Sequence, residues 1–268
     1  MKKLEIFCVT DKKIDFLERL DLKLAGVGKE KFSDKYIECK EGINIEFKEQ
    51  NYSELTFHYW FWKNMLPRYH EDIWIGFCQK RRFWLSKKNK DINNFKELDK
   101  DILKNVPEEW KHYESVLCDK ISVRNAKKMK MIKRGWKNLI KDPSILFNQN
   151  KHTIKLHFDM HHGYGILEKA IKLMNERDKQ EFSNFVNYNS TFSPHIMFIT
   201  KKKIMERWFE DLFSWLFTCE KEFGLNNLKG YDQKRIYAFL AERYLPFWFK
   251  KYSKSICWPW TFFEDKNK

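Results

Sequence analysis

A continuous apolar run at residues 73–78 passes directly into four polar residues, Gln79-Lys80-Arg81-Arg82. Such a run is typical of a strand buried on both faces, as in the parallel sheets of α/β proteins. Guanidinium groups bind phosphate through paired hydrogen bonds. An α/β enzyme commonly presents its nucleotide site at the end of such a strand. The segment therefore predicts an α/β fold with a nucleotide bound beside the two arginines.

A second motif precedes this strand, in residues 51–64, and reads Asn51-Tyr-Ser-Glu-Leu-Thr-Phe-His-Tyr-Trp-Phe-Trp-Lys-Asn64. It predicts a helix over residues 53–64 with Ser53 as its N-cap. Helical spacing places Leu55, Tyr59 and Trp62 on one face, with Glu54, His58 and Trp60 off it. The helix would combine a carboxylate, a lysine and large aromatic side chains.

Composition limits the partners. The chain has 268 residues, a formal net charge of +15 and a sequence pI of about 9.4, which indicates an anionic partner. A nucleic acid, a phosphate-bearing substrate and an anionic membrane all satisfy this condition. No nucleic-acid-binding motif is present, so we expect no nucleic acid.

Cysteine spacing and hydropathy bear on the compartment. The six cysteines form no CxxC pair, which indicates reduced thiols in the cytoplasm. No apolar stretch is long enough to span a bilayer, and the apolar run near the N-terminus is too short for a signal peptide. We expect a cytoplasmic protein, soluble or peripheral on the inner membrane.

The order of predicted elements suggests a sheet followed by helices. Strands are predicted at residues 4–10, 44–47, 73–78, 115–123 and 192–200. Helices are predicted at residues 125–141, 153–175, 204–223 and 231–252. This order predicts an α/β region over residues 1–200 and a helical region over residues 201–268 packed on it, within one structural domain.

These motifs resemble a family of glycosyltransferases from bacterial capsule, exopolysaccharide and lipopolysaccharide gene clusters, a family often known only as a domain of unknown function. Its first motif is matched completely by Glu54-Leu55-Thr56, Tyr59-Trp60 and Trp62-Lys63-Asn64. Its second motif is matched by Gly76-Phe77-Cys78 and Arg81-Arg82, while Gln79 and Lys80 replace a histidine and a tyrosine. Later matches are Met197-Phe198-Ile199, Trp215-Leu216-Phe217, Gln233, Arg235 and Glu242-Arg243.

The resemblance implies a GT-A-like fold, which is a variant Rossmann-type nucleotide-sugar transferase sheet. It also implies a UDP-sugar donor, because some relatives transfer galactofuranose from its UDP-sugar. By analogy with that fold, Thr10 and Asp11 lie where the nucleoside binds, just after the first predicted strand.

GT-A enzymes ordinarily hold a divalent metal with an Asp-x-Asp at the end of the central strand, and this chain has Gln79-Lys80-Arg81-Arg82 there. We expect Arg81 or Arg82 to hold the diphosphate instead, with Lys63 and Lys80 adding charge and Gln79 donating hydrogen bonds to substrate. No metal or other cofactor is expected. The structural alternative is that one arginine pairs with an acid such as Glu54 and the other is solvated.

Inverting sugar transfer needs a general base for the acceptor hydroxyl. The candidate catalytic residues are Glu54, Asp159, His162 and His195, with His161 beside them. A metal cluster at Asp159, His161 and His162 is an alternative, but neighbouring residues on a helix point about 100° apart.

Tyr59 and Trp60 are predicted to bind sugar or acceptor, since aromatic rings stack on sugars and on uracil. Asn64, Glu242 and Arg243 are predicted to bind sugar or acceptor as well. Core packing is the alternative for the rings.

Two aromatic segments amid lysines, residues 208–217 and 258–263, suit an anionic membrane surface and an acceptor linked to polyprenyl diphosphate. A packed helix is the alternative for the first of them. The function that the family resemblance implies is a glycosyltransferase of surface polysaccharide synthesis. The alternatives are transfer of another group to the same glycan, or a non-enzymatic basic module that binds nucleic acid or membrane.

Overall fold

The computed structural model describes residues 3–88, 91–124, 128–226, 228 and 230–265. The chain forms two compact units. Unit 1 consists of Met1–Asp119, His195–Glu210 and Phe249–Lys268, and unit 2 of Lys120–Pro194 and Asp211–Trp248. Helices α9 (Lys202–Phe223) and α11 (Ile236–Tyr252) each contribute to both units. The functional division at residue 200 stays a prediction.

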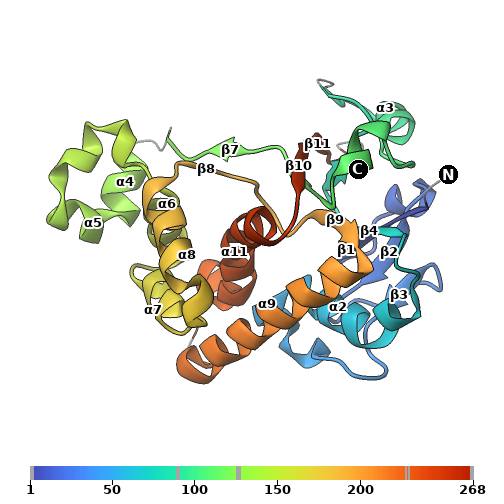
Figure 1. The fold of residues 1–268 in the computed structure, drawn as a ribbon, viewed down its shortest axis with the longest axis horizontal. Helices are drawn as coiled ribbons and strands as arrows, with labels where there is room; N and C mark the ends of the chain where they lie inside the picture. The colour runs from blue at the N-terminus through green and yellow to red at the C-terminus, as the bar shows by residue number, and fades with distance from the viewer. Residues whose placement is uncertain (1–2, 89–90, 125–127, 227, 229, 266–268) are drawn as a thin grey trace. The chain divides into compact units, whose positions relative to one another are not determined.

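The strands of unit 1 form one sheet (Figure 1). They are β1 Leu4–Thr10, β2 Lys23–Gly26, β3 Tyr36–Glu38, β4 Trp74–Gln79, β5 Arg82–Trp84, β6 Ser115–Cys118, β9 Phe198–Lys201, β10 Ser255–Trp258 and β11 Trp260–Phe262. The order is β10-β6-β9-β4-β1-β2-β3, and β5 pairs with β4 and β11. β9 is antiparallel to β4 and β6, whereas β1 is parallel to β2 and β4. The predicted α/β class is confirmed.

Aromatic side chains cover one face of this sheet. Phe57 of α2 (Leu55–Trp60) and Phe61 of the π-helical turn η3 (Phe61–Met65) pack on Phe7 of β1, with ring centroids 5.8 and 4.9 Å away. Side chains alternate along a strand, so Ile6 points to the opposite face, where it joins a second apolar cluster. Both faces of β1 are therefore buried, as its unbroken apolar sequence predicts.

The motif strand β4 is close to its predicted bounds and contains a glycine with a packing role. Gly76 pairs with Ile199 of β9, and a Cβ at residue 76 would lie 2.5 Å from the Ile199 Cγ1. Only glycine allows this close approach. Gly76 therefore permits β9 to pair with the strand that carries the candidate site.

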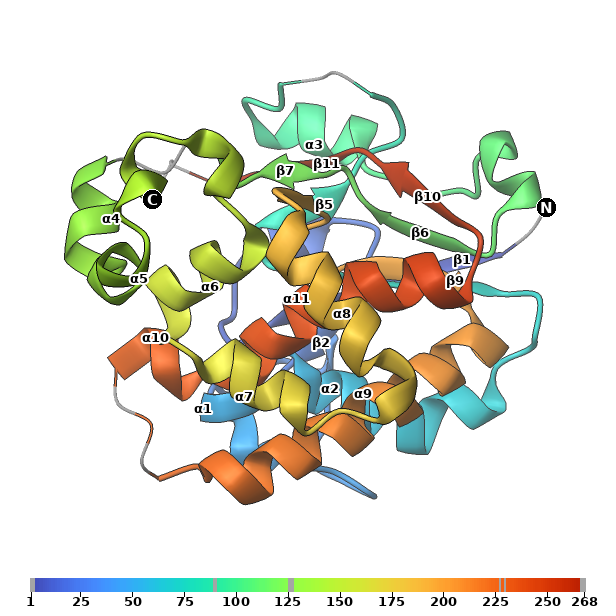
Figure 2. The ribbon, with the colours of Figure 1, turned by 60° about the vertical axis from the view of Figure 1, so that its left-hand side comes forward.

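Unit 2 is mainly helical. Its own helices are α4 Lys128–Arg134, α5 Trp136–Lys141, α6 Ile154–His162, α7 Ile166–Lys172, α8 Glu176–Tyr188 and α10 Gly230–Lys234. Strands β7 (Ile121–Ser122) and β8 (Thr191–Phe192) pair antiparallel. Figure 2 shows α8 beside α11, where the Tyr244 hydroxyl donates to Asp178 at 2.7 Å and its ring lies 5.3 Å from Phe182.

Several local predictions need correction. Residues 44–47 are not a strand, because residues 46–48 form the 3₁₀ turn η2 (Glu46–Lys48). Ser53 is not an N-cap, since its φ is 53° and α2 begins after Glu54 without a side-chain cap. His58, predicted off the apolar face, is 1% exposed and packs 4.1 Å from Phe77. Contact with the sheet, not helical periodicity alone, decides which face of α2 is buried.

Other predicted elements are correct in type but interrupted. The strand predicted at 115–123 is divided into β6 and β7, and the strand at 192–200 into β8 and β9. The helix predicted at 153–175 is divided into α6 and α7 by two glycines with positive φ, Gly163 and Gly165. The helix at 231–252 is divided between α10 and α11, and the basic helix at 125–141 at Gly135, with residues 125–127 outside the described chain. The strand at 4–10 and the helix at 204–223 are confirmed as β1 and α9.

The two aromatic segments proposed as membrane surfaces are packed. Trp208, Phe209, Phe213 and Trp215 of α9 are each at most 5% exposed. The tail forms β10 and β11 of the sheet, and its Trp258 is buried. Packing therefore accounts for the α9 stripe and for most of the tail. None of the described helices is long and apolar enough to cross a bilayer.

Candidate functional site

The carboxyl ends of β1 and β4 lie side by side, since the two strands are parallel and Val9 pairs with Gln79. The residues after each strand therefore meet: the Lys80 ammonium forms an ion pair with the Asp11 carboxylate, and the Lys80 N–H donates to the Val9 carbonyl at 3.2 Å. The Thr10 hydroxyl donates to the Lys12 carbonyl at 2.6 Å and fixes the start of this loop. The structure thus brings the predicted nucleoside loop to the predicted phosphate residues.

Gln79 links the helix motif to the strand motif. Its amide nitrogen donates to a Glu54 carboxylate oxygen, and its amide oxygen accepts from Arg82 Nη1 at 3.1 Å. An amide can donate and accept at once, so it joins a carboxylate to a guanidinium. Arg82 is therefore oriented by Gln79, and the same amide contacts Glu54.

The two arginines lie at a β-hairpin. Residues 80 and 81 form the turn between β4 and β5, and Gln79 pairs with Arg82 across it. Arg81 Nη1 lies 3.0 Å from a Glu264 carboxylate oxygen, with side chains 41% and 54% exposed. The pair is exposed, so a ligand phosphate can replace the carboxylate at small cost.

The C-terminal strand supports this turn, which the sequence did not predict. β11 pairs with β5, with Phe262 opposite Arg82, and the Phe263 N–H donates to the Arg81 carbonyl at 3.0 Å. The Phe262 ring centroid lies 5.7 Å from the Arg81 guanidinium and 5.9 Å from that of Arg82. The apolar alternation of residues 260–262 is the signal that could have revealed this strand.

Lys63 is not brought to the arginines. It lies nine residues after Glu54 along α2 and η3, which is about two and a half helical turns. Its ammonium sits 3.2 Å from the centroid of the Trp62 ring, and burial lowers the pKa of Lys63. Burial also raises the pKa of Tyr59, whose ring meets Trp62 edge-on at 5.9 Å.

Trp60 and Asn64 hold a neighbouring loop. The Trp60 indole N–H donates to the Glu41 carbonyl at 2.5 Å. The Asn64 amide accepts from the Ile43 N–H at 3.0 Å and donates to the Ile43 carbonyl at 2.8 Å. Gly42, with a φ of 72°, lies between these contacts. Trp60 and Asn64, two of the residues predicted to bind sugar or acceptor, therefore also have structural contacts in unit 1.

His195, the remaining candidate in unit 1, has a φ of 68°, and its ring lies 4.7 Å from Trp260. A positive φ at a non-glycine residue is uncommon and costs conformational energy. The chain holds His195 in this conformation just before β9.

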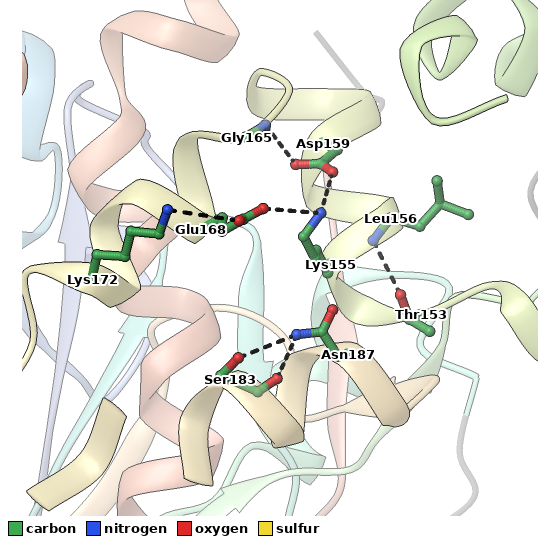
Figure 3. A network of polar contacts seen from close by, with 9 residues as sticks. All are labelled: Thr153, Lys155, Leu156, Asp159, Gly165, Glu168, Lys172, Ser183 and Asn187. Carbon is green, nitrogen blue, oxygen red and sulfur yellow. Dashed lines mark hydrogen bonds and ion pairs between the residues drawn. The ribbon is translucent and has the colours of Figure 1, made fainter. Parts of the chain in front are cut away.

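Four of the predicted site residues, Asp159, His162, Glu242 and Arg243, lie in unit 2. Asp159 accepts from the Lys155 ammonium at 3.0 Å and from the Gly165 N–H at 3.0 Å, as Figure 3 shows. The Arg243 guanidinium is 2% exposed, pairs with Glu242 and contacts His157 Nδ1 at 3.2 Å.

His162 lies on the same helix as Asp159. Its ring is buried and stacks on Phe239 with centroids 3.7 Å apart. Burial, and then the nearby Arg243 charge, lower the pKa of His162 to about 2. The imidazole is therefore neutral at pH 7, and its Nδ1 has no hydrogen-bond partner among the described residues.

A cavity of about 570 Å³ opens beside these side chains in unit 2. Its lining includes Arg134, Trp136, Asp159, His161, His162 and Tyr164. Rings, a carboxylate and imidazoles around one cavity are groups that bind polyhydroxylated ligands. Among the described residues, no group of three or more His, Cys, Asp or Glu side chains is placed to hold a metal ion.

Comparison with solved structures gives a match to the apo structure of the bifunctional glycosyltransferase WbbM, with a TM-score of 0.65 and 20% sequence identity. The match covers 98% of this chain and 46% of that chain, so this chain spans less than half of that protein's length. The GT-A-like fold predicted from the sequence is confirmed by this likeness. No curated protein matches the sequence.

A family model matches residues 5–254, which include both motifs, the β4–β5 turn and the cavity residues of unit 2 named above. The match extends over most of the 268 residues. The chain therefore belongs to the family described as a domain of unknown function (DUF4422).

Proposed function

We propose that this protein is a glycosyltransferase that moves a sugar from a UDP-sugar to a glycan hydroxyl during synthesis of a bacterial surface polysaccharide. The observation that carries the proposal is the β4–β5 turn, where Arg81 and Arg82 follow the strand beside the Thr10–Asp11 loop. Parallel α/β sheets bind nucleotides at the carboxyl ends of adjacent strands. The GT-A-like fold and the likeness to a glycosyltransferase structure support this assignment.

The arginines are proposed to bind the diphosphate. A guanidinium can make two parallel hydrogen bonds to phosphate and keeps its charge at any pH in use. Arg82 is held by Gln79, and Arg81 would exchange Glu264 for phosphate. Their charge would stabilise the UDP leaving group as the glycosidic bond of the donor breaks. No metal is required by this scheme.

The acceptor glycan is proposed to bind in the cavity of unit 2, with Trp136 and Tyr164 as stacking surfaces. The neutral His162 imidazole lines this cavity, and its buried Nδ1 has no hydrogen-bond partner among the described residues, whereas both Asp159 oxygens already accept hydrogen bonds. A general base works best with a pKa near the operating pH. The low pKa of His162 therefore favours hydrogen bonding over proton removal while the ring stays buried. Glu242 and Arg243 would support this region from α11.

The donor is proposed to be of the galactofuranose type, on the resemblance of the motifs. The acceptor is proposed to be linked to polyprenyl diphosphate, with the enzyme on the cytoplasmic face of the inner membrane. The net charge of +15 supports an anionic acceptor and an anionic membrane.

Calorimetric titration with UDP, UDP-galactose and UDP-galactofuranose in EDTA, and then with Mn²⁺, tests the donor site. We expect UDP to bind in EDTA. Arg81→Ala and Arg82→Ala should each weaken binding by roughly a hundredfold, because each removes charge-assisted hydrogen bonds. Arg68→Ala is the matched control, since Arg68 is exposed and lies in η4 (Leu66–Arg68) before β4.

Unchanged UDP affinity in both arginine variants would remove the diphosphate role. Binding that needs Mn²⁺ would move attention to carboxylates such as Asp119 and Asp159. Absence of UDP binding together with tight oligonucleotide binding would favour the non-enzymatic module, and UDP binding without sugar transfer would favour transfer of another group.

A further inference from the structure

The segment of residues 128–141 in unit 2 has an unusual charge composition. It contains Lys128, Lys130, Lys133, Arg134, Lys137 and Lys141 but no acidic residue. Six of its fourteen residues are basic, against 52 of the 268 residues in the whole chain. The segment forms α4 and α5, shown together in Figure 1.

The same two helices expose large apolar side chains. Met129, Ile132, Trp136 and Ile140 are 64%, 47%, 52% and 71% exposed. Met129 and Ile132 are three residues apart in α4, and Trp136 and Ile140 are four apart in α5, so each helix exposes an apolar pair on one of its faces. These four side chains are called the apolar row. Phe147, in the segment that follows, is 80% exposed. Exposed apolar groups gathered on one face mark an interaction surface.

The buried side of α4 fixes the orientation of its exposed side chains. Met131 is 1% exposed and packs with Leu156 and Met160 of α6. The Gly135 N–H donates to the Met131 carbonyl at 2.7 Å and so extends the hydrogen bonding of α4 to the break. The apolar pair of α4 is therefore held outward by the packing of Met131 on α6.

Basic side chains flank the apolar row. Lys133 of α4 is exposed, and so are Lys137 and Lys141, which are four residues apart on α5. These three side chains are called the basic row. Arg134 pairs with Asp232 at 3.5 Å. An apolar row beside a basic row is the arrangement of helices that lie in a membrane interface.

We propose that α4 and α5 dock unit 2 on an anionic phospholipid surface, with Met129, Ile132, Trp136 and Ile140 entering the headgroup region and the lysines contacting lipid phosphates. A nucleic acid would match the charge but not the apolar row. A second copy of this chain would bring like charges together. An anionic bilayer satisfies both rows at once.

This inference rests on the membrane contact in the proposed function and assigns its surface. The α9 stripe cannot be that surface, because it is buried. Trp136 and Arg134 also line the cavity assigned to the acceptor. A glycan linked to a membrane lipid would thus meet its proposed binding cavity at the docked helices.

Vesicle flotation with the 268-residue chain tests the inference. We expect binding to vesicles of equal parts phosphatidylglycerol and phosphatidylcholine, and none to phosphatidylcholine alone. The triple change Lys133→Ser, Lys137→Ser and Lys141→Ser should weaken binding roughly a hundredfold, because each lysine near an anionic surface contributes about fivefold. Ile132→Ser with Ile140→Ser should weaken it about tenfold or more.

Two controls match these variants. Lys100→Ser, Lys104→Ser and Lys111→Ser remove the same charge from exposed positions of unit 1, and Tyr188→Ser removes an 81% exposed ring from α8. Both should bind as the unaltered chain does. Equal losses in the controls, or full binding by the isoleucine variant, would overturn the assignment of α4 and α5.

Calorimetry with UDP on the same variants separates the two proposals. Unchanged UDP affinity is expected, because none of the altered residues belongs to the β4–β5 turn. Failure of the unaltered chain to bind anionic vesicles while it binds UDP would reject the membrane surface and leave the donor site standing.

Discussion

Gln79 shows how one side chain joins two motifs in the candidate donor site. Its amide bridges Glu54 and Arg82, so both ends of the polar chain are satisfied without ligand. A carboxylate at this position could not donate to Glu54. Arg82 is therefore oriented without a ligand, which would reduce the entropy lost when the proposed nucleotide binds.

Glu264→Gln should strengthen UDP binding about two- to fivefold. The Glu264 carboxylate holds Arg81 at 3.0 Å in the free protein, and an exposed ion pair of this kind contributes up to about 1 kcal/mol that phosphate must replace. Calorimetry would measure the change, with Asp99→Asn, which removes the exposed Lys104–Asp99 pair elsewhere in unit 1, as control. Weaker binding would mean that Glu264 instead positions Arg81 for the ligand.

His58 should make the protein acid-sensitive. Burial lowers the pKa of His58 from 6.5 to about 3, so below pH 6.5 the unfolded chain binds a proton that the folded chain does not. The free energy of unfolding should therefore fall as the pH falls from about 6.5 towards 3, by at most about 1.4 kcal/mol per pH unit for this group.

Chemical denaturation at pH 7 and pH 5 checks this expectation. His58→Leu should lose less stability between the two pH values than the unaltered chain. His70→Leu, at an exposed position, should keep the original pH dependence. An identical pH dependence in the His58 variant would show that other groups cause the acid sensitivity.

At the level of elements, the turn between α6 and α7 depends on two glycines for different reasons. Gly163 has a φ of 118°, and a Cβ there would lie 2.5 Å from Ile166 Cδ1. Gly165 has a φ of 75°, and a Cβ there would meet no atom within 4 Å. The N–H of Gly165 is also held by Asp159 (Figure 3).

Gly163→Ala should therefore destabilise unit 2 by about 3 kcal/mol and Gly165→Ala by about 1 kcal/mol, since only the first adds a steric clash to backbone strain. Urea denaturation followed by the fluorescence of the aromatic side chains would measure both. Equal losses would mean that Ile166 moves aside at little cost.

The pairing of β11 with β5 decides the shape of the candidate donor site. Phe262 and Glu264 reach the arginines only because the last strand returns to the hairpin that follows β4. The pairing of β5 with β11 closes a loop that contains most of the chain, and contacts throughout the fold must compensate for the entropy lost in closing it. The element that completes the site is therefore the one furthest from it in sequence.

For the whole molecule, the net charge of +15 raises the question of which anion binds specifically. Binding of single-stranded nucleic acid weakens with salt by a slope of about −0.7 for each neutralised phosphate. UDP offers two phosphates, so its affinity should fall much less between low and physiological salt than that of an oligonucleotide. Titrations of both ligands over a salt series would measure the slopes.

Arg81→Ala serves as the control for that series. It should weaken UDP binding roughly a hundredfold and leave the oligonucleotide slope nearly unchanged, because one of 52 basic residues is lost. Equal salt slopes for the two ligands, with no effect of the variant, would point to binding by general surface charge.

The sequence by itself determined β1, β4 and α9, because buried strands need unbroken apolar runs and a packed helix needs helical periodicity. Thr10 and Asp11 were placed by analogy with the fold, and the parallel pairing of β1 with β4 is what brings them beside Gln79 and the arginines. The assignment of roles to the predicted site residues stays a prediction.

Tertiary structure alone decided the rest. The sequence pattern of α9 suited a membrane surface as well as a packed helix, and its burial shows that packing prevailed. Likewise, the sequence motif grouped Lys63 with the arginines, but Lys63 lies about two and a half helical turns along the helix from Glu54. Local periodicity specifies which residues are apolar, whereas the partner that covers them is set by contacts between segments distant in sequence.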